Sequence, residues 1–404
     1  MSSSSSCAKP EFQSGQDVSG YTIVGKLGSG GFGAVYHVKK DALQAALKTE
    51  FVVKESSQTL KNEVHILRLM QWSPHFCRLY AAKRLTWQDQ KVNIMVMSLC
   101  GRPLSRLRRM MPQRHFTRET AARLSFMILK ALHDLHQSGI LHRDVKASNC
   151  GWHEPTRQIM LFDLGFCRKF LDKDPKTGKL KHREARKSAG FIGTSKFCSV
   201  YAHDEKDQGR RDDLWAWLYT TAEFFLGSLP WSNEDNSHLV STQKHKISNK
   251  LFLRCPREIY TIFNHVKQLK FDSCPDYPMM LKEFQNMLTR LQIFDEEVFD
   301  FEPGSAYYEQ YYANRQTDSE CEDCQMLTTD LETSASTGEQ TKASRIVDVD
   351  PAPALNEVVG AGAGAGAQEA VITLNSSKSS EKDGGVQRLA AGLNRAFNRI
   401  IGNE

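Results

Sequence analysis

The segment Leu141-His142-Arg143-Asp144-Val145-Lys146-Ala147-Ser148-Asn149 carries the strongest functional signal in this chain of 404 residues. Nineteen residues after Asp144, the apolar run 159–162 leads into Asp163. One carboxylate that accepts a hydroxyl proton, one that holds Mg²⁺, an amide oxygen for the same metal and a lysine for the transferred phosphate form a complete phosphoryl-transfer set. The alternative is a loop that holds polar residues by chance, and three earlier features of the sequence argue against it.

The first of these features is the glycine-rich segment Gly28-Ser29-Gly30-Gly31-Phe32-Gly33-Ala34-Val35. Glycines let the backbone approach phosphates closely and adopt positive φ. By itself the spacing fits a plain β-turn equally well. A dinucleotide-binding domain would need a helix directly after the last glycine, whereas residues 35–38 alternate like a strand. A glycine loop between two strands fits a flap that closes over a nucleotide.

Lys48 and Glu63 are the other two features. Lys48 falls in a short apolar strand that we expect over 44–49, and Glu63 falls on a predicted helix over 60–70. Taken alone, each residue would be interpreted as a surface charge. If the helix packs on the strand, however, Glu63 can pair with Lys48 and direct its ammonium group at phosphate oxygens. The glycine loop and the two aspartate segments favour this second interpretation.

Composition places the chain among ordinary globular proteins. Hydrophobic residues make up 40% and charged residues 25% of the sequence, which is enough for a sizeable core. We find no apolar run of transmembrane length, no secretory signal and no Gly at position 2 for myristoylation. We therefore expect the ten cysteines to be reduced thiols, and the pair Cys321 and Cys324 fits chance spacing better than a zinc site. We expect a cytoplasmic location and allow for a nuclear one.

The chain divides into four segments by composition. Residues 1–19 are Ser-rich and expected to be flexible, 20–302 carry periodic apolar patterns, 303–385 form an acidic tail rich in Ala and Gly that is expected to be disordered, and 386–401 have the spacing of a short amphipathic helix. The net charge is +13 for 1–302 and −7 for 303–404, so the body attracts anions. Two helices stand out in the body: a nearly all-apolar run over 214–226, and an amphipathic stripe formed by Ala121, Leu124, Ile128, Ala131 and Leu135.

These segments together resemble the eukaryotic protein kinases over about residues 20–302. The resemblance implies an α+β, bilobal protein kinase fold, with a small β-rich N-lobe at about 20–100 and a large, mostly α-helical C-lobe at about 101–302. It implies catalytic roles for Lys48 and Glu63 as the activating ion pair, Asp144 as the base and Lys146 as support for the γ-phosphate. The implied cofactors are ATP and Mg²⁺, with Asn149 and Asp163 as metal ligands. The implied nucleotide-binding residues are Gly28, Gly30, Gly33, Val35, Ala46, Lys48, Met97, Leu99, Asn149 and Asp163, with Met97 as gatekeeper and 98–101 as hinge.

Later segments narrow the subfamily. Lys146 is typical of serine/threonine kinases. The order Gly193-Thr194-Ser195-Lys196-Phe197, Gly209-Arg210-Arg211-Asp212-Asp213 and Gly227-Ser228-Leu229-Pro230-Trp231 is similar to the casein kinase I superfamily, and most to its tau-tubulin kinase-like branch, which is much expanded in nematodes. By this resemblance Asp213 braces the catalytic loop. The implied function is ATP-dependent phosphorylation of Ser or Thr in acidic or pre-phosphorylated proteins, by a monomer that binds no nucleic acid.

Four residues depart from the family pattern, and none of them removes a catalytic group. Leu164 replaces the usual Phe after the metal-binding Asp, and as an apolar residue it is expected to preserve the packing there. Gly151 stands where a larger apolar residue usually forms the floor below the adenine, which puts ATP affinity in doubt. Tyr201 replaces an Asn, and Ser98 replaces an acidic hinge residue.

Two other classes of function compete with an active kinase. A catalytically silent pseudokinase would use the fold as a binding scaffold. A nucleic-acid-binding protein is indicated only by the basic body, and the sequence has no interleaved aromatics or recognised signature for that role. A measurement of phosphate transfer from labelled ATP to an acidic protein distinguishes an active kinase from a pseudokinase.

The substrate and the tail invite further hypotheses. Residues 168–187 hold nine Lys or Arg against three Asp or Glu, which indicates either a solvated loop or a surface that attracts acidic substrates, with Lys196 at the position where relatives hold the substrate anion. We expect activity without phosphorylation of the activation segment, with Thr194 in a structural role. The acidic tail is either an inert chain or a pseudosubstrate. Residues 386–401 are either a frayed end or a helix that docks weakly on the kinase domain or on lipid.

Overall fold

The computed structural model describes residues 11–29, 33–52, 59–294 and 297–312, all within one compact unit of the chain. The expectations for Gly30, for residues 1–10 and for everything after residue 312 lie outside the described residues. These include nearly all of the acidic tail, Cys321 and Cys324, and the amphipathic spacing of 386–401.

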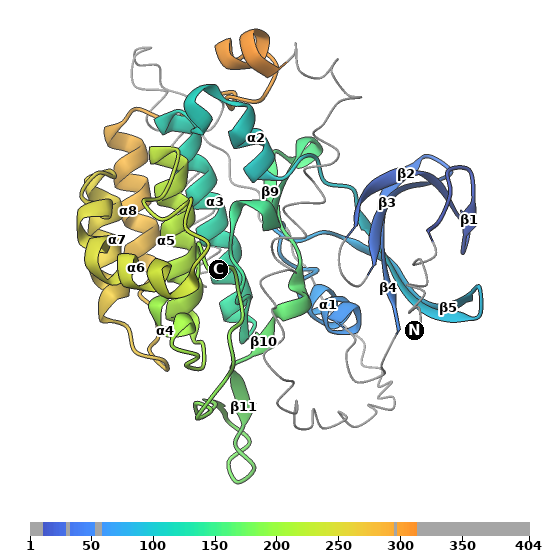
Figure 1. Cartoon of the computed structure of the whole chain (residues 1–404), viewed down its shortest axis with the longest axis horizontal. Helices are drawn as coiled ribbons and strands as arrows, with labels where there is room; N and C mark the ends of the chain where they lie inside the picture. The colour runs from blue at the N-terminus through green and yellow to red at the C-terminus, as the bar shows by residue number, and fades with distance from the viewer. Residues whose placement is uncertain (1–10, 30–32, 53–58, 295–296, 313–404) are drawn as a thin grey trace, which may run out of the picture. The chain divides into compact units, whose positions relative to one another are not determined.

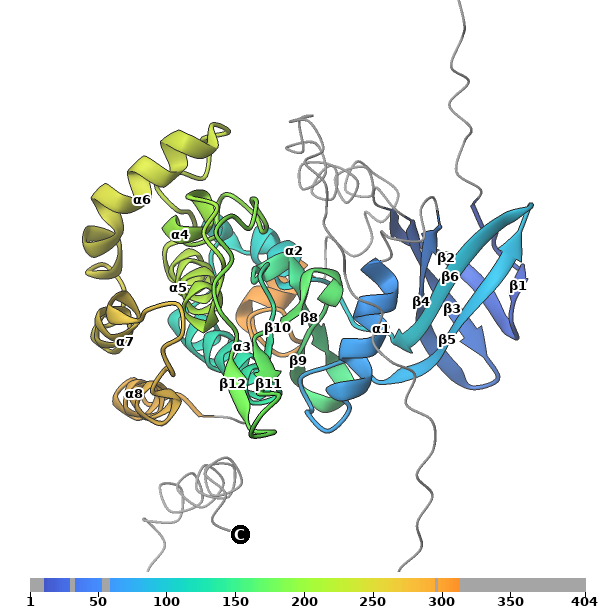
Figure 2. The same ribbon diagram turned by 90° about the horizontal axis from the view of Figure 1, so that it is seen from below.

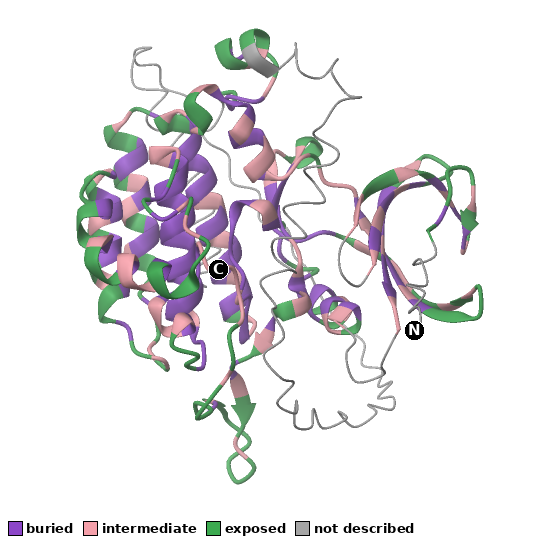
Figure 3. Cartoon of the chain, in the orientation of Figure 1, coloured by how far each residue is buried: buried purple, intermediate pink, exposed green. Residues whose placement is uncertain are grey.

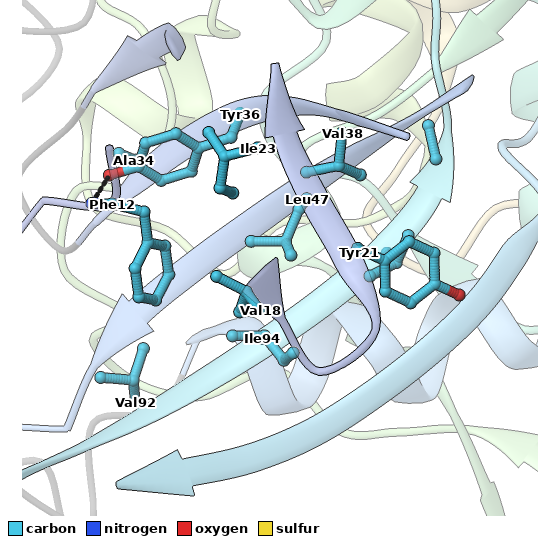
Figure 4. Packing of buried hydrophobic residues seen from close by; sticks show 12 residues of the cluster. Phe12, Val18, Tyr21, Ile23, Ala34, Tyr36, Val38, Leu47, Val92 and Ile94 are labelled. Atoms are coloured by element: carbon cyan, nitrogen blue, oxygen red, sulfur yellow. Dashed lines mark hydrogen bonds between the residues drawn. The ribbon is translucent and has the colours of Figure 1, made fainter. Parts of the chain in front are cut away.

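An antiparallel sheet that curls around an apolar core forms the first part of the described chain (Figure 1). In spatial order its strands are β1 (Asp17–Val18), β2 (Tyr21–Ser29), β3 (Ala34–Lys40), β4 (Leu43–Phe51), β6 (Gln90–Ser98) and β5 (Leu79–Trp87). Alternate side chains of the strands meet inside the curl, as Figure 4 shows for Ile23, Val38, Leu47 and Ile94. Phe12 closes this cluster, and its backbone N donates a 3.2 Å hydrogen bond to the Tyr36 hydroxyl.

Helix α1 (Thr59–Leu69) packs against β4, β5 and β6. Its buried residues include Glu63, a carboxylate in an otherwise apolar face. The helix has no acidic residue in its first turn, and Glu50 of β4 supplies the missing acceptor. Its Oε1 accepts from the backbone N of Thr59 at 2.7 Å and of Leu60 at 3.1 Å. Because anions stabilise helix N-termini, Glu50 fixes the start of α1 close to Lys48 on the same strand.

The second part of the described chain is mostly helical. Its helices are α2 (Leu104–Met110), α3 (Arg118–Gln137), α4 (Val200–His203), α5 (Arg210–Leu226), α6 (Ser237–Phe252), α7 (Arg257–Gln268) and α8 (Tyr277–Arg290). Helix α3 packs against α5 and α8, and Figure 3 shows the buried residues concentrated where these helices face one another. The predicted stripe of α3 and the apolar run in α5 are both confirmed, because the five stripe residues are buried and α5 is buried along most of its length.

Short strands and single turns complete the described chain, and the strands within residues 150–169 lie between the sheet and the helices (Figure 2). The strands form the pairs β7 (Ile140–Leu141) with β10 (Arg168–Lys169), β8 (Cys150–His153) with β9 (Gln158–Leu161), and β11 (Leu171–Lys173) with β12 (Leu180–His182). The turns are η1 (Pro112–Arg114), η2 (Ala147–Asn149), η3 (Glu154–Thr156), η4 (Leu164–Phe166) and the π-helical turn η5 (Tyr308–Tyr312). Because β8 follows the 141–149 segment and pairs with β9, which precedes Asp163, this pair brings the two predicted aspartate segments together.

The architecture confirms the predicted α+β fold with a small β-rich part and a larger helical part. The sequence did not predict β5 or the short strands of the second part, because they lack a clear apolar alternation. Among the residues that the structure describes, no helix combines the length and the apolar character needed to cross a membrane.

Candidate active site

Lys48 joins two carboxylates that come from distant parts of the chain. Its Nζ lies 2.8 Å from Glu63 Oε2 on α1 and 3.2 Å from Asp163 Oδ1, which follows β9. Burial alone would lower the pKa of Lys48, but the two carboxylates raise it above its ordinary value, so the ammonium stays charged. Lys48 in turn holds the pKa of Asp163 below its ordinary value. The structure thus brings these three predicted residues together.

Polar side chains of the 141–149 segment form hydrogen bonds and an ion pair with one another and with Thr194. Thr194 donates from its hydroxyl to Asp144 Oδ1 at 2.7 Å and accepts from Lys146 Nζ at 2.8 Å. Lys146 Nζ also lies 3.0 Å from Asp144 Oδ2. Asn149 Nδ2 donates to the backbone O of Asp144 at 2.8 Å and to its Oδ2 at 3.1 Å. Each polar group therefore has its position set by at least one other member of the set.

Asp213 of α5 holds the start of the 141–149 segment by hydrogen bonds to its backbone. Its carboxylate accepts from the backbone N of His142 at 2.8 Å and of Arg143 at 2.7 Å. His136 Nε2 contacts the same carboxylate at 2.8 Å. Burial would raise the pKa of Asp213, but these hydrogen bonds hold it below its ordinary value. Arg143 has φ of 70°, a costly conformation for a non-glycine residue, and the bond to Asp213 helps to maintain it.

Asn62 is a positioning residue that the sequence analysis missed. It lies next to Glu63 on α1, and its Nδ2 donates to the backbone O of Gly165 at 3.2 Å and of Cys167 at 3.0 Å. This ties α1 to the segment that follows Asp163, whose φ of 60° is also left-handed. No pattern in the sequence marks Asn62, because its partners are backbone atoms about a hundred residues away along the chain.

The predicted nucleotide-binding residues line the strands next to Lys48. In the registers of β2, β3, β4 and β6, Gly28 faces Val35, Val35 faces Lys48, and Ala46 faces Met97. The glycine loop thus lies between two strands, as predicted. A side chain on Gly33 would place its Cβ 1.9 Å from the backbone O of Thr49, so only glycine fits there. Leu99 is partly buried just beyond β6.

Gly151 is surrounded by residues that fill the space of the missing floor side chain. A Cβ built on Gly151 would lie 2.9 Å from Cε1 of Phe162 and 3.1 Å from Cβ of Cys100. Phe162 directly precedes Asp163, and Cys100 lies in the predicted hinge. The floor is therefore not left open: the ring of Phe162 and the Cβ of Cys100 occupy the volume that a larger residue at 151 would take.

The other three departures from the expected pattern have local explanations. Leu164 is 1% exposed, on η4, which packs against α1. The side chain of Ser98 is used within the sheet, where its Oγ accepts from the backbone N of Arg78 at 3.0 Å. The ring of Tyr201 makes a cation–π contact with the guanidinium of Arg211, whose Cζ lies 3.5 Å from the ring centroid.

The donor set at Asp163 and Asn149 fits a magnesium ion. Asn149 donates from its Nδ2 to Asp144, so its amide oxygen is the atom that would accept a metal; its backbone O accepts from the N of Phe162, the residue before Asp163, at 3.0 Å. Magnesium is commonly held by one or two protein oxygens together with phosphate oxygens and water. Among the described residues, no cluster of three or more His, Cys, Asp or Glu side chains offers a separate metal site.

Lys196 is not free to bind an anion by itself. Its Nζ lies 2.7 Å from Glu223 Oε1 on α5, and Arg108 contacts the same atom at 3.2 Å. The carboxylate of Glu223 is almost fully buried. The sequence could not show this pairing, because Glu223 falls within an apolar helix.

Four arginines, Arg143, Arg168, Arg183 and Arg186, lie close enough to influence one another electrostatically. Burial and the neighbouring guanidinium groups of Arg168 and Arg186 lower the pKa of Arg143 to about 10. Burial and the charges of Arg183 and Arg186 also lower the pKa of Arg168. Asp207 binds two members of this group, with contacts to the Nη1 of Arg183 and, at 3.0 Å, to the Nη2 of Arg186. The carboxylate of Asp207 is thus the ion-pair partner of two of these four arginines.

Comparisons with known proteins bear on the whole arrangement. Residues 21–297 match the family model of the protein kinase domain. A protein of Dictyostelium discoideum named a probable serine/threonine-protein kinase is 33% identical over 298 residues, which are 72% of this chain and 58% of that protein. The serine/threonine-protein kinase spe-6 of Caenorhabditis elegans is 31% identical over 294 residues, 70% of this chain and 75% of that protein. A candidate casein kinase I of the same nematode is 31% identical over 238 residues, 57% of this chain and 67% of that protein.

Proposed function

The chain belongs to the protein kinase family, among the serine/threonine kinases, and from this premise we propose that it transfers the γ-phosphate of ATP to Ser or Thr of protein substrates. The observation that carries the proposal is the joint geometry of Lys48, Glu63, Asp163 and the bonded set of Asp144, Lys146, Thr194 and Asn149. A pseudokinase is the weaker alternative, because the sequence lacks none of the residue types that the transfer requires.

Each residue takes one part of the task. Lys48, oriented by Glu63, binds phosphate oxygens of the nucleotide. Asp163 and Asn149 would hold Mg²⁺, which neutralises charge on the transferred phosphate. Asp144 orients the acceptor hydroxyl and takes its proton, and Lys146 stabilises the charge that develops on the phosphate.

The decisive experiment measures phosphate transfer from labelled ATP to casein, an acidic protein. We expect Ser and Thr of casein to become labelled by the wild-type chain and not by Asp163→Asn. Absence of transfer by wild type, with normal binding of ATP, would favour the pseudokinase scaffold instead.

We further propose that the substrates are acidic or already phosphorylated, as in the casein kinase I superfamily, with placement nearest its tau-tubulin kinase-like branch. The support is the basic 168–187 stretch, which holds nine Lys or Arg against three Asp or Glu, and in particular Arg168, since Arg143, Arg183 and Arg186 are already bonded to Phe166 O or to Asp207. Lys196, already bonded to Glu223, takes a secondary part. Guanidinium forks suit phosphate and carboxylate groups.

Paired peptides test this preference. A peptide with an acidic or phosphorylated cluster near the acceptor Ser should be phosphorylated faster than its neutral counterpart, and Arg168→Gln should reduce the ratio. Because charges at the surface are screened over about 10 Å, the ratio should fall as salt is added. Equal rates for the two peptides at low salt would refute the preference.

We also propose that the kinase is active without phosphorylation of the activation segment. Arg143 already donates from Nε to the backbone O of Phe166 at 2.7 Å, and Asp207 already bonds Arg183 and Arg186. These contacts supply what a loop phosphate would otherwise provide. Bacterially expressed, phosphatase-treated protein should transfer phosphate; an inactive preparation that an upstream kinase rescues would contradict the proposal.

A further inference from the structure

Cys100, in the predicted hinge at 98–101, places its sulfur atom 3.4 Å from that of Cys77, which lies before β5. Cys77 lies two residues before β5 and Cys100 two residues after its neighbour β6. Cys77 is 2% exposed, whereas Cys100 is only partly buried. Among the described residues, no other two cysteines have their sulfur atoms in such contact.

Backbone hydrogen bonds hold both cysteines in place. Ser98 N donates to the backbone O of Arg78 at 2.9 Å, which fixes the end of the strand pair. The side-chain amide of Gln71 donates to the backbone O of Cys77 at 3.0 Å. On the other side, Gly101 N donates to a carbonyl of β8 at 2.7 Å. These bonds fix the backbone of the two segments that carry the cysteines.

We propose that Cys77 and Cys100 are a modification site that a hydroperoxide oxidises to an intramolecular disulfide, and that the cross-linked form binds nucleotide more weakly. The cross-link itself is independent of the proposed function, whereas its effect on nucleotide binding rests on that function. The sulfur atoms need to approach by roughly 1.4 Å to reach disulfide length, a shift within reach of small side-chain rotations.

The chemistry proceeds in two balanced steps. The Cys100 sulfur attacks one peroxide oxygen; the S–O bond of a sulfenic acid forms, the O–O bond breaks, and the other oxygen leaves with the Cys100 proton as an alcohol, or as water when the oxidant is hydrogen peroxide. The Cys77 sulfur then attacks the Cys100 sulfur; the S–S bond forms, the S–O bond breaks, and the hydroxyl leaves as water with the Cys77 proton. Two thiols lose two electrons, and the peroxide gains them. Its hydrogen bond with Cys100 and its burial raise the pKa of Cys77 well above the ordinary value, so the more accessible Cys100 reacts first.

The position of Cys100 connects the cross-link to the nucleotide floor. Its Cβ would lie 3.1 Å from a Cβ on Gly151, so a movement of Cys100 toward Cys77 changes the shape of that floor. The segment before Cys77 is anchored to the helical part, since His75 O accepts from the backbone N of Leu161 at 2.8 Å. The disulfide would therefore also tie the hinge to an anchored loop and restrict its adjustment to a nucleotide.

The test uses the full chain and hydrogen peroxide. Oxidation should lower the mass by about 2 Da for each disulfide, through loss of two hydrogen atoms, and digestion should yield a peptide that links Cys77 to Cys100. Dithiothreitol should reverse both. By calorimetry, adenosine diphosphate should bind the oxidised chain at least fivefold more weakly than the reduced chain.

Variants assign the effect to the pair. Cys77→Ser should bind adenosine diphosphate normally when reduced and should show neither the linked peptide nor the oxidative loss; Cys77→Ala serves if the serine variant does not fold. Cys274→Ser, which removes an exposed thiol elsewhere, should respond like wild type. A sulfinic acid on Cys100 without a link, a link to another cysteine, or equal affinities of the oxidised and reduced chains would overturn the proposal. A chain that forms the cross-link on oxidation but transfers no phosphate in its reduced form would refute the kinase function alone.

Discussion

The 141–149 segment and the nucleotide floor at Gly151 are neighbours in the chain, yet their geometries are determined in different ways. In the first, Asp144, Lys146 and Asn149 bond to one another and to Thr194. At the floor, side chains from separate segments fit around Gly151 by shape. A hydrogen-bond network specifies the chemistry of each member, whereas packing specifies mainly a total volume. The first region should therefore tolerate no substitution, and the second should tolerate compensated ones.

Lys48→Met gives the largest expected effect, because it removes the charge that joins Glu63 to Asp163 and that we propose binds the nucleotide. Turnover should fall about a thousandfold or more, since this chemistry depends on positioning and electrostatics. Steady-state kinetics on casein measure it. Lys39→Met, which removes an exposed lysine from neighbouring β3, should retain wild-type turnover. Turnover of Lys48→Met near that of wild type would show that Lys48 has been assigned wrongly.

The same contrast explains what the sequence could predict. Asp144, Lys146, Asn149 and Asp163 were predicted because their types and spacing belong to one chemistry and lie on two short segments. The partners of Glu50 and Asn62 could not be predicted, because they are backbone atoms brought close only by the fold. The same holds for Glu223, which pairs with Lys196 from inside an apolar helix. The filling of the Gly151 floor by Phe162 was equally hidden, since compensation of volume leaves no local pattern.

The buried side chain of His75 makes the stability of the fold depend on pH in a way that can be measured. Burial, together with Lys130, lowers its pKa to about 3, so the folded state keeps His75 neutral. The unfolded state binds a proton on His75 from about pH 6.5 downward, whereas the folded state does not. The free energy of unfolding is therefore at its full value above that pH and decreases as the pH falls toward 3. Between pH 7 and pH 5 this amounts to about 2 kcal/mol.

Urea unfolding at pH 7 and pH 5 measures this loss. His75→Gln should lose about 2 kcal/mol less than wild type over the same interval, whereas His238→Gln, at an exposed position, should follow wild type. The same pH dependence in His75→Gln as in wild type would assign acid lability to other groups.

Gly151→Leu tests the compensated floor. The new side chain meets Phe162 and Cys100 at distances that real Cβ atoms rarely reach, so the KM for ATP should rise about tenfold, which corresponds to about 1.4 kcal/mol of strain. The double variant Gly151→Leu with Phe162→Leu should recover most of the affinity. Gly25→Leu, where a Cβ meets no atom within 4 Å, is the matched control. If the double variant binds ATP no better than the single one, volume is not what defines this floor.

Glu50→Gln should have the smallest effect. It retains an acceptor for the first turn of α1 but removes the negative charge, which costs about 1 kcal/mol of stability. Because α1 carries Glu63, turnover should fall a few fold as the pairing with Lys48 loosens. Thermal unfolding and casein kinetics give the two values, with Glu205→Gln as an exposed control. An unchanged melting temperature would show that the helix start is held by other contacts.

Asp144→Asn tests the central assignment most directly, because in this account Asp144 acts on the acceptor hydroxyl and takes no part in holding the nucleotide. Turnover at saturating ATP should fall at least about a hundredfold, while the dissociation constant of adenosine diphosphate, measured by calorimetry on the same preparation, should stay within about twofold of wild type because Lys48, Asp163 and Asn149 are intact. Turnover by Asp144→Asn close to that of wild type would contradict the account.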